Sequence, residues 1–418
     1  MFNNIIDFFK SNSFFRFSIY GFAFSSTFSV AAGQIFLSFV VLSWLIKMIL
    51  NKKIIYRKSP IDIFILAYLI SQVIASLFSQ YKIESLSNVL NNEWIVILFF
   101  AIASNIDEES FKRAIIILIT SSAIVSIYSI GQHYFGYDIY RSRTLRLYGG
   151  FYRAEGFFGM CLTYGGYVMA VTVTAMGGFF SHTHRKLKWF FGVTSLVLFY
   201  SVIVSYTRSN WIAVHLAGFV LSFLKGFRYI LVFIGFILVF WLMIYYFHTS
   251  LLTFKSFESM VDVSQDMPKS NMARLELWKK SLEIFKDHPI FGLGIGQLKK
   301  VHDEYDFPVV ARYGHPHNDF LNIGVNSGLI GLIPFVLIWF IFFKSVLRKY
   351  FFSEDVNKNS LLLSLVLGGA IAVFGFLVSG LFQCYYTDLE DGMLWWFITA
   401  LTMGALSFGT SNEKKLFY

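Results

Sequence analysis

Apolar runs alternate with short polar or charged connections along almost the whole chain. A helix of about 20 apolar residues can cross a lipid bilayer, and many of these runs approach that length. The pattern predicts an all-α integral membrane protein with about twelve transmembrane helices, since a helix satisfies its own backbone hydrogen bonds in lipid. The predicted spans are residues 14–30, 33–50, 61–79, 90–105, 112–132, 157–180, 188–207, 210–224, 229–247, 321–343, 359–383 and 390–408.

Lysine and arginine gather in alternate connections, and this placement predicts the orientation. Cytoplasmic loops of membrane proteins carry the excess of these residues. With an even number of spans, we expect both ends of the chain in the cytoplasm and the odd-numbered connections at the outer face. The cationic residues on the predicted inner side are Lys47, Lys52, Lys53, Arg57, Lys58, Lys112, Arg113, Arg185, Lys186, Lys188, Lys225, Arg228, Lys344, Arg348, Lys349, Lys358, Lys414 and Lys415.

Two outer connections are long enough to hold a functional site. One runs from Phe135 to Gly156 and the other from His248 to Asp319. The longer one contains a helical stretch, Met272 to Lys286, with one apolar face that we expect to pack on the membrane helices. The residues of that face are Leu275, Leu277, Trp278, Leu282 and Phe285. The chain then divides into helices one to nine over 1–247, an outer loop with amphipathic helices over 248–319, and helices ten to twelve over 320–418.

The composition excludes several other classes of protein. Hydrophobic residues make up 56% of the chain and charged residues 14%, against about 45–50% and about 25% in ordinary soluble domains. Too few charges remain to coat a soluble enzyme. Cys161 and Cys384 are too few for a disulfide-stapled secreted domain. The first apolar run is followed by further spans, so we expect it to remain as an anchor rather than be cleaved as a signal peptide.

Arginines also occur at the predicted outer face, against the inward bias. Arginine binds phosphate oxygens in a bidentate manner and keeps its charge, so outward arginines suit an anionic phosphate ligand. Arg208 lies in a tight turn between two spans, where we favour anion binding. For the arginines of the shorter loop, taken singly, solvation or contact with lipid headgroups is favoured. The outer arginines are Arg141, Arg143, Arg146, Arg153, Arg208, Arg274 and Arg312.

The segment Gly314 to Phe320 holds the strongest candidate for a base. Asn318 or Asp319 can cap the helix that follows, and glycines recur along one face of that helix at Gly324, Gly328 and Gly331, which favours close approach to a neighbour. Extending this stripe backward by seven residues reaches His317. The helix dipole disfavours a second proton there, so we expect a neutral imidazole able to act as a base, with a purely structural histidine as the alternative.

Metal and nucleotide chemistry are less attractive. His315 and His317 are two apart and have no third ligand at suitable spacing, so we expect no metal. The run Gly292-Leu-Gly294-Ile-Gly296 lacks the lysine and hydroxyl residue of a phosphate loop and predicts a flexible turn. For His215, inside a span, a hydrogen bond between helices is favoured over a proton relay.

Several ordered motifs resemble one known family. His317-Asn318, nine residues, Gly328, two residues and Gly331 are similar to the histidine motif of the bacterial O-antigen ligase and O-antigen polymerase superfamily. Three further parts of this chain resemble other signatures of the family. They are Met272 to Trp278 together with Gly292 to Gly296, then Thr207-Arg208, and Arg153 to Gly156. The resemblance covers residues from about 150 to 345. One position departs from the ligase pattern. Ligases often have a leucine four residues after the arginine that corresponds to Arg274, and this chain has Trp278 there.

The resemblance, most like the ligase, implies a glycosyltransferase of the bacterial inner membrane that works at the periplasmic face in lipopolysaccharide biosynthesis. Its donor would be a polysaccharide, the O-antigen, on undecaprenyl diphosphate, and its acceptor lipid A-core. Arg208 and Arg274 would clamp the diphosphate, and His317 would take the proton of the acceptor hydroxyl. Transfer would invert the anomeric carbon and need neither a metal nor another cofactor. Among the supporting residues, Arg153 would help hold the donor, and Asn318 and Asp319 would orient His317. The other supporting residues would be His315 and Arg312.

Other acceptors and classes stay open at this point. A polymerase would use the end of a second lipid-linked glycan, and a protein O-oligosaccharyltransferase a serine or threonine. A polysaccharide transporter is less attractive, because internal repeats and intramembrane charges typical of transporters are not evident. Membrane lipids are expected partners, and nucleic acid is not, because the net charge of +10 follows the predicted loop topology.

Overall fold

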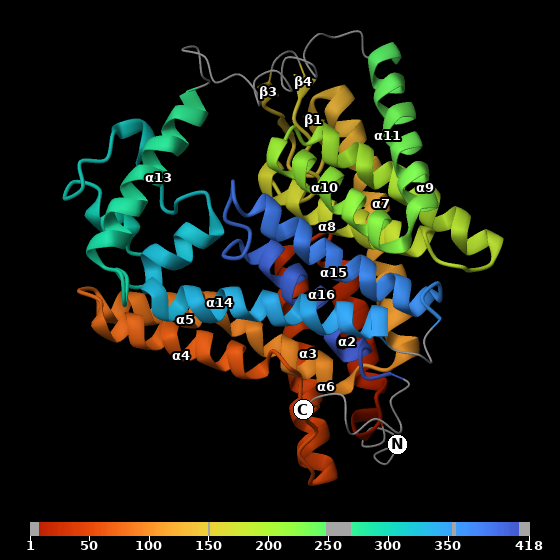
Figure 1. The fold of residues 1–418 in the computed structure, drawn as a ribbon, viewed down its shortest axis with the longest axis horizontal. Helices are drawn as coiled ribbons and strands as arrows, with labels where there is room; N and C mark the ends of the chain where they lie inside the picture. The colour runs from red at the N-terminus through yellow and green to blue at the C-terminus, as the bar shows by residue number, and fades with distance from the viewer. Residues whose placement is uncertain (1–7, 149–150, 248–268, 353–356, 409–418) are drawn as a thin grey trace.

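The computed structural model describes residues 8–148, 151–247, 269–352 and 357–408 (Figure 1). Helices make up most of these residues. The α-helices are α2 Ser13–Ser25, α3 Val30–Asn51, α4 Asp62–Phe78, α5 Lys82–Glu93, α6 Ile97–Asn105, α7 Glu108–Phe135, α8 Cys161–Phe179, α9 Arg185–Val204, α10 Arg208–Lys225, α11 Phe227–Phe247, α13 Lys269–Asp287, α14 Asp319–Phe352, α15 Leu361–Ser379 and α16 Leu389–Ala405. Short 3-10 turns are η1 Trp94–Val96, η2 Leu298–Val301 and η3 Val309–Ala311, and the strands β1 Tyr137–Asp138, β2 Arg143–Thr144, β3 Leu147–Tyr148 and β4 Phe151–Tyr152 form two antiparallel pairs.

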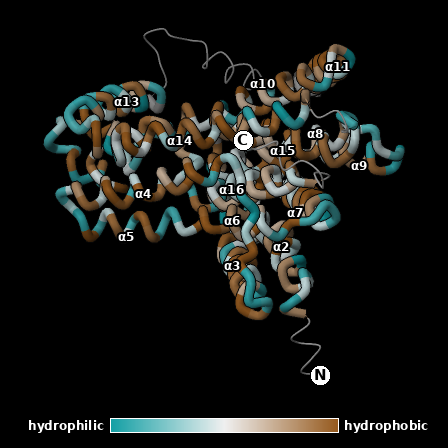
Figure 2. Tube along the Cα trace, turned by 60° about the horizontal axis from the view of Figure 1, so that its bottom comes forward, coloured by the Kyte–Doolittle hydropathy of each residue, from teal (hydrophilic) through white to brown (hydrophobic). Residues whose placement is uncertain are grey.

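Every predicted span coincides with a helical segment of the described chain. Six of these segments are long and apolar enough to cross a membrane: α3, Lys82–Asn105, α7, α9, α14 and α15. Shorter apolar helices are Asp62–Phe78 and Phe227–Leu242. Figure 2 shows apolar residues along α3, α4 and α14 and many polar ones on α13. The chain is an all-α membrane protein, while the number of twelve spans stays a prediction.

Several predicted boundaries move, and two of the changes have a clear cause. Residues 14–50 divide before Val30 rather than around residues 31–33, because the Ser29 hydroxyl accepts a hydrogen bond from the backbone N–H of Ala32 and caps α3. The span predicted at 90–105 begins eight residues earlier, at Lys82, because α5 carries many polar side chains and hydropathy alone does not reveal it. The 3-10 turn at 94–96 joins α5 to α6.

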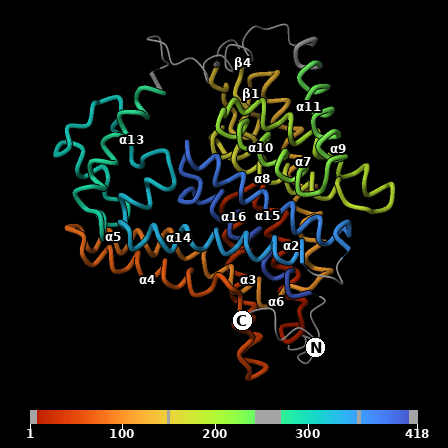
Figure 3. The backbone as a smooth tube through the Cα atoms, viewed as in Figure 1, coloured from red at the N-terminus to blue at the C-terminus, as the bar shows by residue number. Residues whose placement is uncertain are grey.

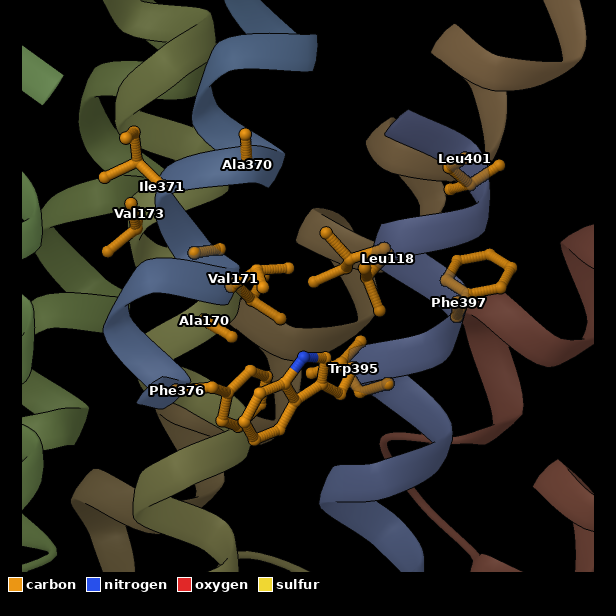
Figure 4. Close-up of a cluster of buried hydrophobic side chains, with 14 of the residues drawn as sticks. Leu118, Ala170, Val171, Val173, Ala370, Ile371, Phe376, Trp395, Phe397 and Leu401 are labelled. Atoms are coloured by element: carbon orange, nitrogen blue, oxygen red, sulfur yellow. The ribbon is translucent and has the colours of Figure 1, made fainter. Parts of the chain in front are cut away.

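A core of large side chains joins α7, α8, α15 and α16 (Figure 4). The ring of Phe376 on α15 stacks on Trp395 of α16 with 4.9 Å between centroids and 6° between planes. Leu118 of α7 and Val171 of α8 are both fully buried in the same cluster. Aromatic rings and aliphatic side chains thus fill the space between these helices, as dispersion forces require.

A second group of helices lies beside this core. Helix α14 runs along α4, with α5 next to them and α13 above (Figures 1 and 3). Helix α14 is interrupted at Gly328, where φ is 59° and ψ is −157°, a conformation open essentially to glycine alone. Next to this interruption, the N–H of Leu329 donates to the carbonyl of Pro289 at 2.8 Å. The expectation that Gly328 lies on one continuous helical face is therefore wrong, whereas the expected close approach to a neighbouring segment is confirmed, because the backbone of Ile290 lies directly against Gly328.

The glycine run at 292–296 forms a packed segment rather than the predicted flexible turn. The N–H groups of Leu293 and Gly294 donate to the carbonyls of Val325 and Asn326 at 2.8 and 2.9 Å. A Cβ atom at Gly294 would lie 2.3 Å from Oγ of Ser79 in the α4–α5 connection. The glycines are needed because this backbone lies directly against α14, the α4–α5 connection and α5, so the run ties the outer segment to these helices.

We expect Gly328→Ala to destabilise the protein. A Cβ atom there would lie 2.3 Å from the carbonyl oxygen of Ile290, and the backbone conformation alone costs a residue other than glycine about 1–3 kcal/mol. Thermal unfolding in detergent should show a lower Tm. The matched control is Gly235→Ala on α11, where nothing lies within 4 Å of an added Cβ. Equal Tm values for the two variants would contradict the assigned role of the interruption.

Candidate functional site

The histidine segment is held by α13 and by the start of α14. Trp278 on α13 donates its indole N–H to the carbonyl of Pro316 at 2.9 Å. The side-chain oxygen of Asn318 accepts the N–H of Leu321 at 3.0 Å and so caps α14. Helix α14 begins at Asp319, so His317 precedes the helix and does not extend its glycine stripe as predicted.

His317 has an unusual backbone and a well-defined ring. Its φ is 52°, in the left-handed region that few residues other than glycine occupy. Nδ1 of its ring is hydrogen-bonded to Oε1 of Gln383, and Nε2 has no hydrogen-bond partner among the described residues. Burial lowers the pKa of His317, the bond to Gln383 opposes this shift, and the charge of Arg274 adds to it. The lowered pKa favours a neutral imidazole, and its main cause is burial rather than the helix dipole that the sequence suggested.

His315 lies against His317 but has different surroundings. The ring centroids are 4.5 Å apart, and Nδ1 of His315 accepts the backbone N–H of His317 at 3.3 Å. Burial, with the nearby His317, Lys299 and Arg274, lowers the pKa of His315 to about 4. A neutral His315 whose Nδ1 accepts a hydrogen bond carries its proton on Nε2. It therefore supports the backbone of His317 and offers no lone pair of its own.

Three arginines come together beside the histidines. Arg208 is the first residue of α10, and its guanidinium donates to the side-chain oxygen of Asn271, on α13, at 3.0 Å. Arg153 donates to the carbonyls of Ser205 and Tyr206 at 3.2 and 3.1 Å, in the turn before α10. Arg274 is close enough to both for their charges to lower its pKa, burial being the larger cause. The structure thus gathers arginines that are distant in the sequence.

Arg274 joins the arginines to the histidines. Its charge also lowers the pKa of His315 and His317. The side chain is partly buried, and burial and nearby charges, with no hydrogen bond to a described residue, account for its lowered pKa. A cation that is partly buried beside other cations is costly unless an anion accompanies it. The site can therefore receive an anionic group next to a neutral imidazole.

Asn318 and Asp319 hold the loop between α15 and α16 rather than the ring of His317. Asn318 donates to the carbonyl of Leu381 at 3.0 Å. The carboxylate of Asp319 is buried and accepts the N–H groups of Tyr385 and Tyr386 at 3.2 and 3.1 Å. This loop carries the glutamine that bonds to His317. The predicted orienting role of Asn318 and Asp319 is thus indirect.

Other predicted residues lie elsewhere. Arg312 forms an ion pair with Asp303 at 2.7 Å and is not brought to the arginine cluster. Arg141 pairs with the buried carboxylate of Asp138 at 3.2 Å, and Arg143 with Glu155. These two arginines connect the β1–β2 pair to the segment before α8. The sequence favoured solvation or contact with lipid headgroups for them, and the structure shows ion pairs instead. Arg146 is exposed.

The apolar face of α13 differs in part from the prediction. Leu277 is fully buried, whereas Leu275 and Leu282 are 49% and 46% exposed. Ala273 and Ile284 are buried in their place. Leu277 and Ile284 belong to a small hydrophobic cluster with Leu298, Val301, Phe307, Ala311 and, from α14, Val325.

The prediction for His215 agrees with the structure. Its Nδ1 is hydrogen-bonded to the carbonyl of Trp211 at 2.7 Å, and its Nε2 accepts the indole N–H of Trp241 at 3.1 Å.

Several residues of the site were missed from the sequence. Gln383, Tyr385, Asn271 and Lys299 carry no motif of their own, and only their contacts with predicted residues reveal them. Within the described residues, no group of three or more His, Cys, Asp or Glu side chains is placed to hold a metal ion.

The described chain is a predominantly helical membrane protein with an arginine and histidine cluster at the ends of its apolar helices. Residues 193–336, about a third of the chain, match the family described as O-antigen ligase. This match supports the O-antigen ligase superfamily to which the motifs pointed, and it includes Arg208, Arg274 and His317. Its members, ligases and polymerases, are enzymes that transfer glycans in a membrane environment from lipid-linked substrates. No curated protein matches the chain.

We expect Asp319→Asn to destabilise the α15–α16 loop. The amide keeps only one acceptor oxygen for two buried N–H groups, and an unsatisfied buried group costs about 1–3 kcal/mol. Thermal unfolding in detergent should show a lower Tm for Asp319→Asn than for Glu304→Gln, an exposed acid changed in the same way. Equal stability of the two variants would mean that the carboxylate does not hold the loop.

Proposed function

We propose that this protein is an O-antigen ligase. It would transfer a polysaccharide from undecaprenyl diphosphate to lipid A-core at the periplasmic face of the bacterial inner membrane. The observation that carries the proposal is the partly buried Arg274, which lies between two other arginines and a neutral His317. The family match supports glycan transfer in general, and this geometry supports the division of labour among the residues.

Arg274 and Arg208 bind the diphosphate in this mechanism. Their guanidinium groups provide planar, permanently charged donors for phosphate oxygens, and Arg208 adds its charge to the N-terminus of α10. Negative charge grows on the diphosphate as the glycosidic bond breaks. Fixed cations already in place stabilise that charge, which is the task a divalent metal performs in many sugar transferases. Arg153 holds the turn that carries Arg208.

His317 is the base. Its Nε2 takes the proton from the acceptor hydroxyl while the hydroxyl oxygen attacks the anomeric carbon. The new glycosidic bond forms as the bond to the diphosphate breaks, and undecaprenyl diphosphate leaves with the electron pair. A single displacement from the opposite side inverts the anomeric configuration. The energy comes from the donor bond, so neither nucleotide nor metal takes part.

The acceptor distinguishes the closest alternatives. A polymerase would place a second lipid-linked glycan at the same base, and a protein O-oligosaccharyltransferase a serine or threonine. The His315-x-His317-Asn318 arrangement, which resembles ligases, favours lipid A-core. Purified protein with the undecaprenyl-diphosphate donor should therefore label lipid A-core. Label on a second lipid-linked glycan instead would make the protein a polymerase, and label on a peptide acceptor a protein glycosyltransferase.

We expect His317→Ala to abolish transfer while the protein stays folded. Without the base, general catalysis worth about 10²–10⁴-fold in rate is lost. Initial rates of transfer are compared with those of His288→Ala, an exposed histidine beyond the end of α13, which should behave as wild type. Transfer by His317→Ala at the wild-type rate would remove His317 from the mechanism.

The pH dependence of transfer should show a single acidic limb. His317 acts as a base only when neutral, and burial places its pKa below the ordinary value of 6.5. Activity should therefore fall only as the pH drops through a midpoint below 6.5, and stay level from there to pH 8. A midpoint above 6.5 in initial-rate measurements would contradict this assignment.

Arg274→Ala should lower kcat about 10²–10³-fold, because a preorganised donor to the leaving group is lost. Arg274→Lys keeps the charge without the bidentate geometry and should retain part of the activity. Lys279→Ala, an exposed cation on the same helix, is the control. Each active variant should have the same rate with and without EDTA. Strict dependence on an added divalent metal would contradict the arginine mechanism.

A further inference from the structure

The loop between α15 and α16, residues 380–388, lies outside the matched family region and yet reaches the candidate base. Its attachment to the start of α14 is extensive. The N–H of Asp319 donates to the carbonyl of Gly380 at 2.7 Å, and its carboxylate accepts two N–H groups further along the loop. The ring centroids of Phe382 and Trp278 are 6.2 Å apart. Contacts therefore fix the backbone on both sides of Gln383.

The side chain of Gln383 is 8% exposed and has one described partner, Nδ1 of His317. A neutral imidazole carries its proton on one nitrogen only, and the hydrogen bond made by that nitrogen selects the tautomer. With Oε1 as the acceptor, the proton lies on Nδ1. The lone pair is then on Nε2, the nitrogen without a hydrogen-bond partner among the described residues.

We infer that Gln383 is a positioning residue that holds His317 in the Nδ1–H tautomer and directs Nε2 toward the acceptor hydroxyl. The inference rests on the proposed role of His317 as the base. Gln383 also stabilises the imidazolium that forms when Nε2 takes the proton, because Oε1 still accepts the Nδ1–H at that stage. The backbone of His317 lies in the left-handed region. It is held by the hydrogen bond from its N–H to His315 and by the bond from the neighbouring Asn318 to the carbonyl of Leu381.

Two substitutions of similar size test this role. Gln383→Leu removes the acceptor, so kcat should fall about 10- to 100-fold, the worth of a hydrogen bond to a group that becomes charged. The KM for the donor should stay unchanged, because the arginines bind the diphosphate. Gln383→Glu supplies a charged acceptor that favours the imidazolium. The acidic limb of the pH–rate profile should therefore move to lower pH in Gln383→Leu and to higher pH in Gln383→Glu.

Gln80→Leu and Gln80→Glu are the matched controls, because Gln80 is exposed in the α4–α5 connection. Both should keep the wild-type rate and pH profile, and thermal unfolding should show all four variants folded. Opposite shifts of the acidic limb are not expected from a merely structural glutamine. An unchanged profile in both Gln383 variants would overturn the inference. So would a faster Gln383→Leu, since the glutamine would then hold the unproductive tautomer.

The failure of this inference differs from that of the proposed function. Activity retained in His317→Ala would overturn both, because no base would be left to position. An inactive His317→Ala together with Gln383 variants of wild-type rate and pH profile would overturn only the role of Gln383.

Discussion

The candidate site depends on a buried carboxylate at the start of α14. Asp319 accepts two backbone N–H groups from the α15–α16 loop, and its own N–H donates to the first residue of that loop. Burial of a carboxylate is expensive, and these bonds compensate part of that cost. Because His317 and Asn318 directly precede Asp319, the same attachment places the imidazole beside Gln383. The geometry of the candidate site thus depends on the polar contacts of this one carboxylate.

A second constraint brings the arginines to this place. The interruption of α14 at Gly328 lets its backbone bond to the segment that follows α13, and the glycine run continues the contact toward α4. Helix α13 is thereby fastened above α14, with Arg274 and Trp278 one turn apart and both close to the histidine segment. The tryptophan that departs from the usual ligase leucine thus has a structural task, because its indole N–H holds the Pro316 carbonyl.

The sequence predicted the helices well and the site in part. A long apolar run in lipid must satisfy its own backbone hydrogen bonds and therefore forms a helix. For this reason each predicted span coincides with a helix. Arg208, Arg274 and His317 were recognisable because charged and polar groups stand out against apolar neighbours. Gln383 was not, since its role depends on a contact 66 residues away along the chain. The Gly328 interruption escaped for a similar reason: a smooth glycine stripe and a broken helix have the same local sequence.

The distance between Arg208 and Gln383 along the chain has a consequence for biosynthesis. A chain synthesised only as far as α14 already holds the arginines and histidines, but not the loop that Asp319 and His317 bind. Since helices are made and inserted from the N-terminus onward, the last two must enter before the ring of His317 is fixed. A nascent or interrupted chain would thus hold the arginines and histidines without the contact from Gln383. The candidate site is complete only when insertion is nearly complete.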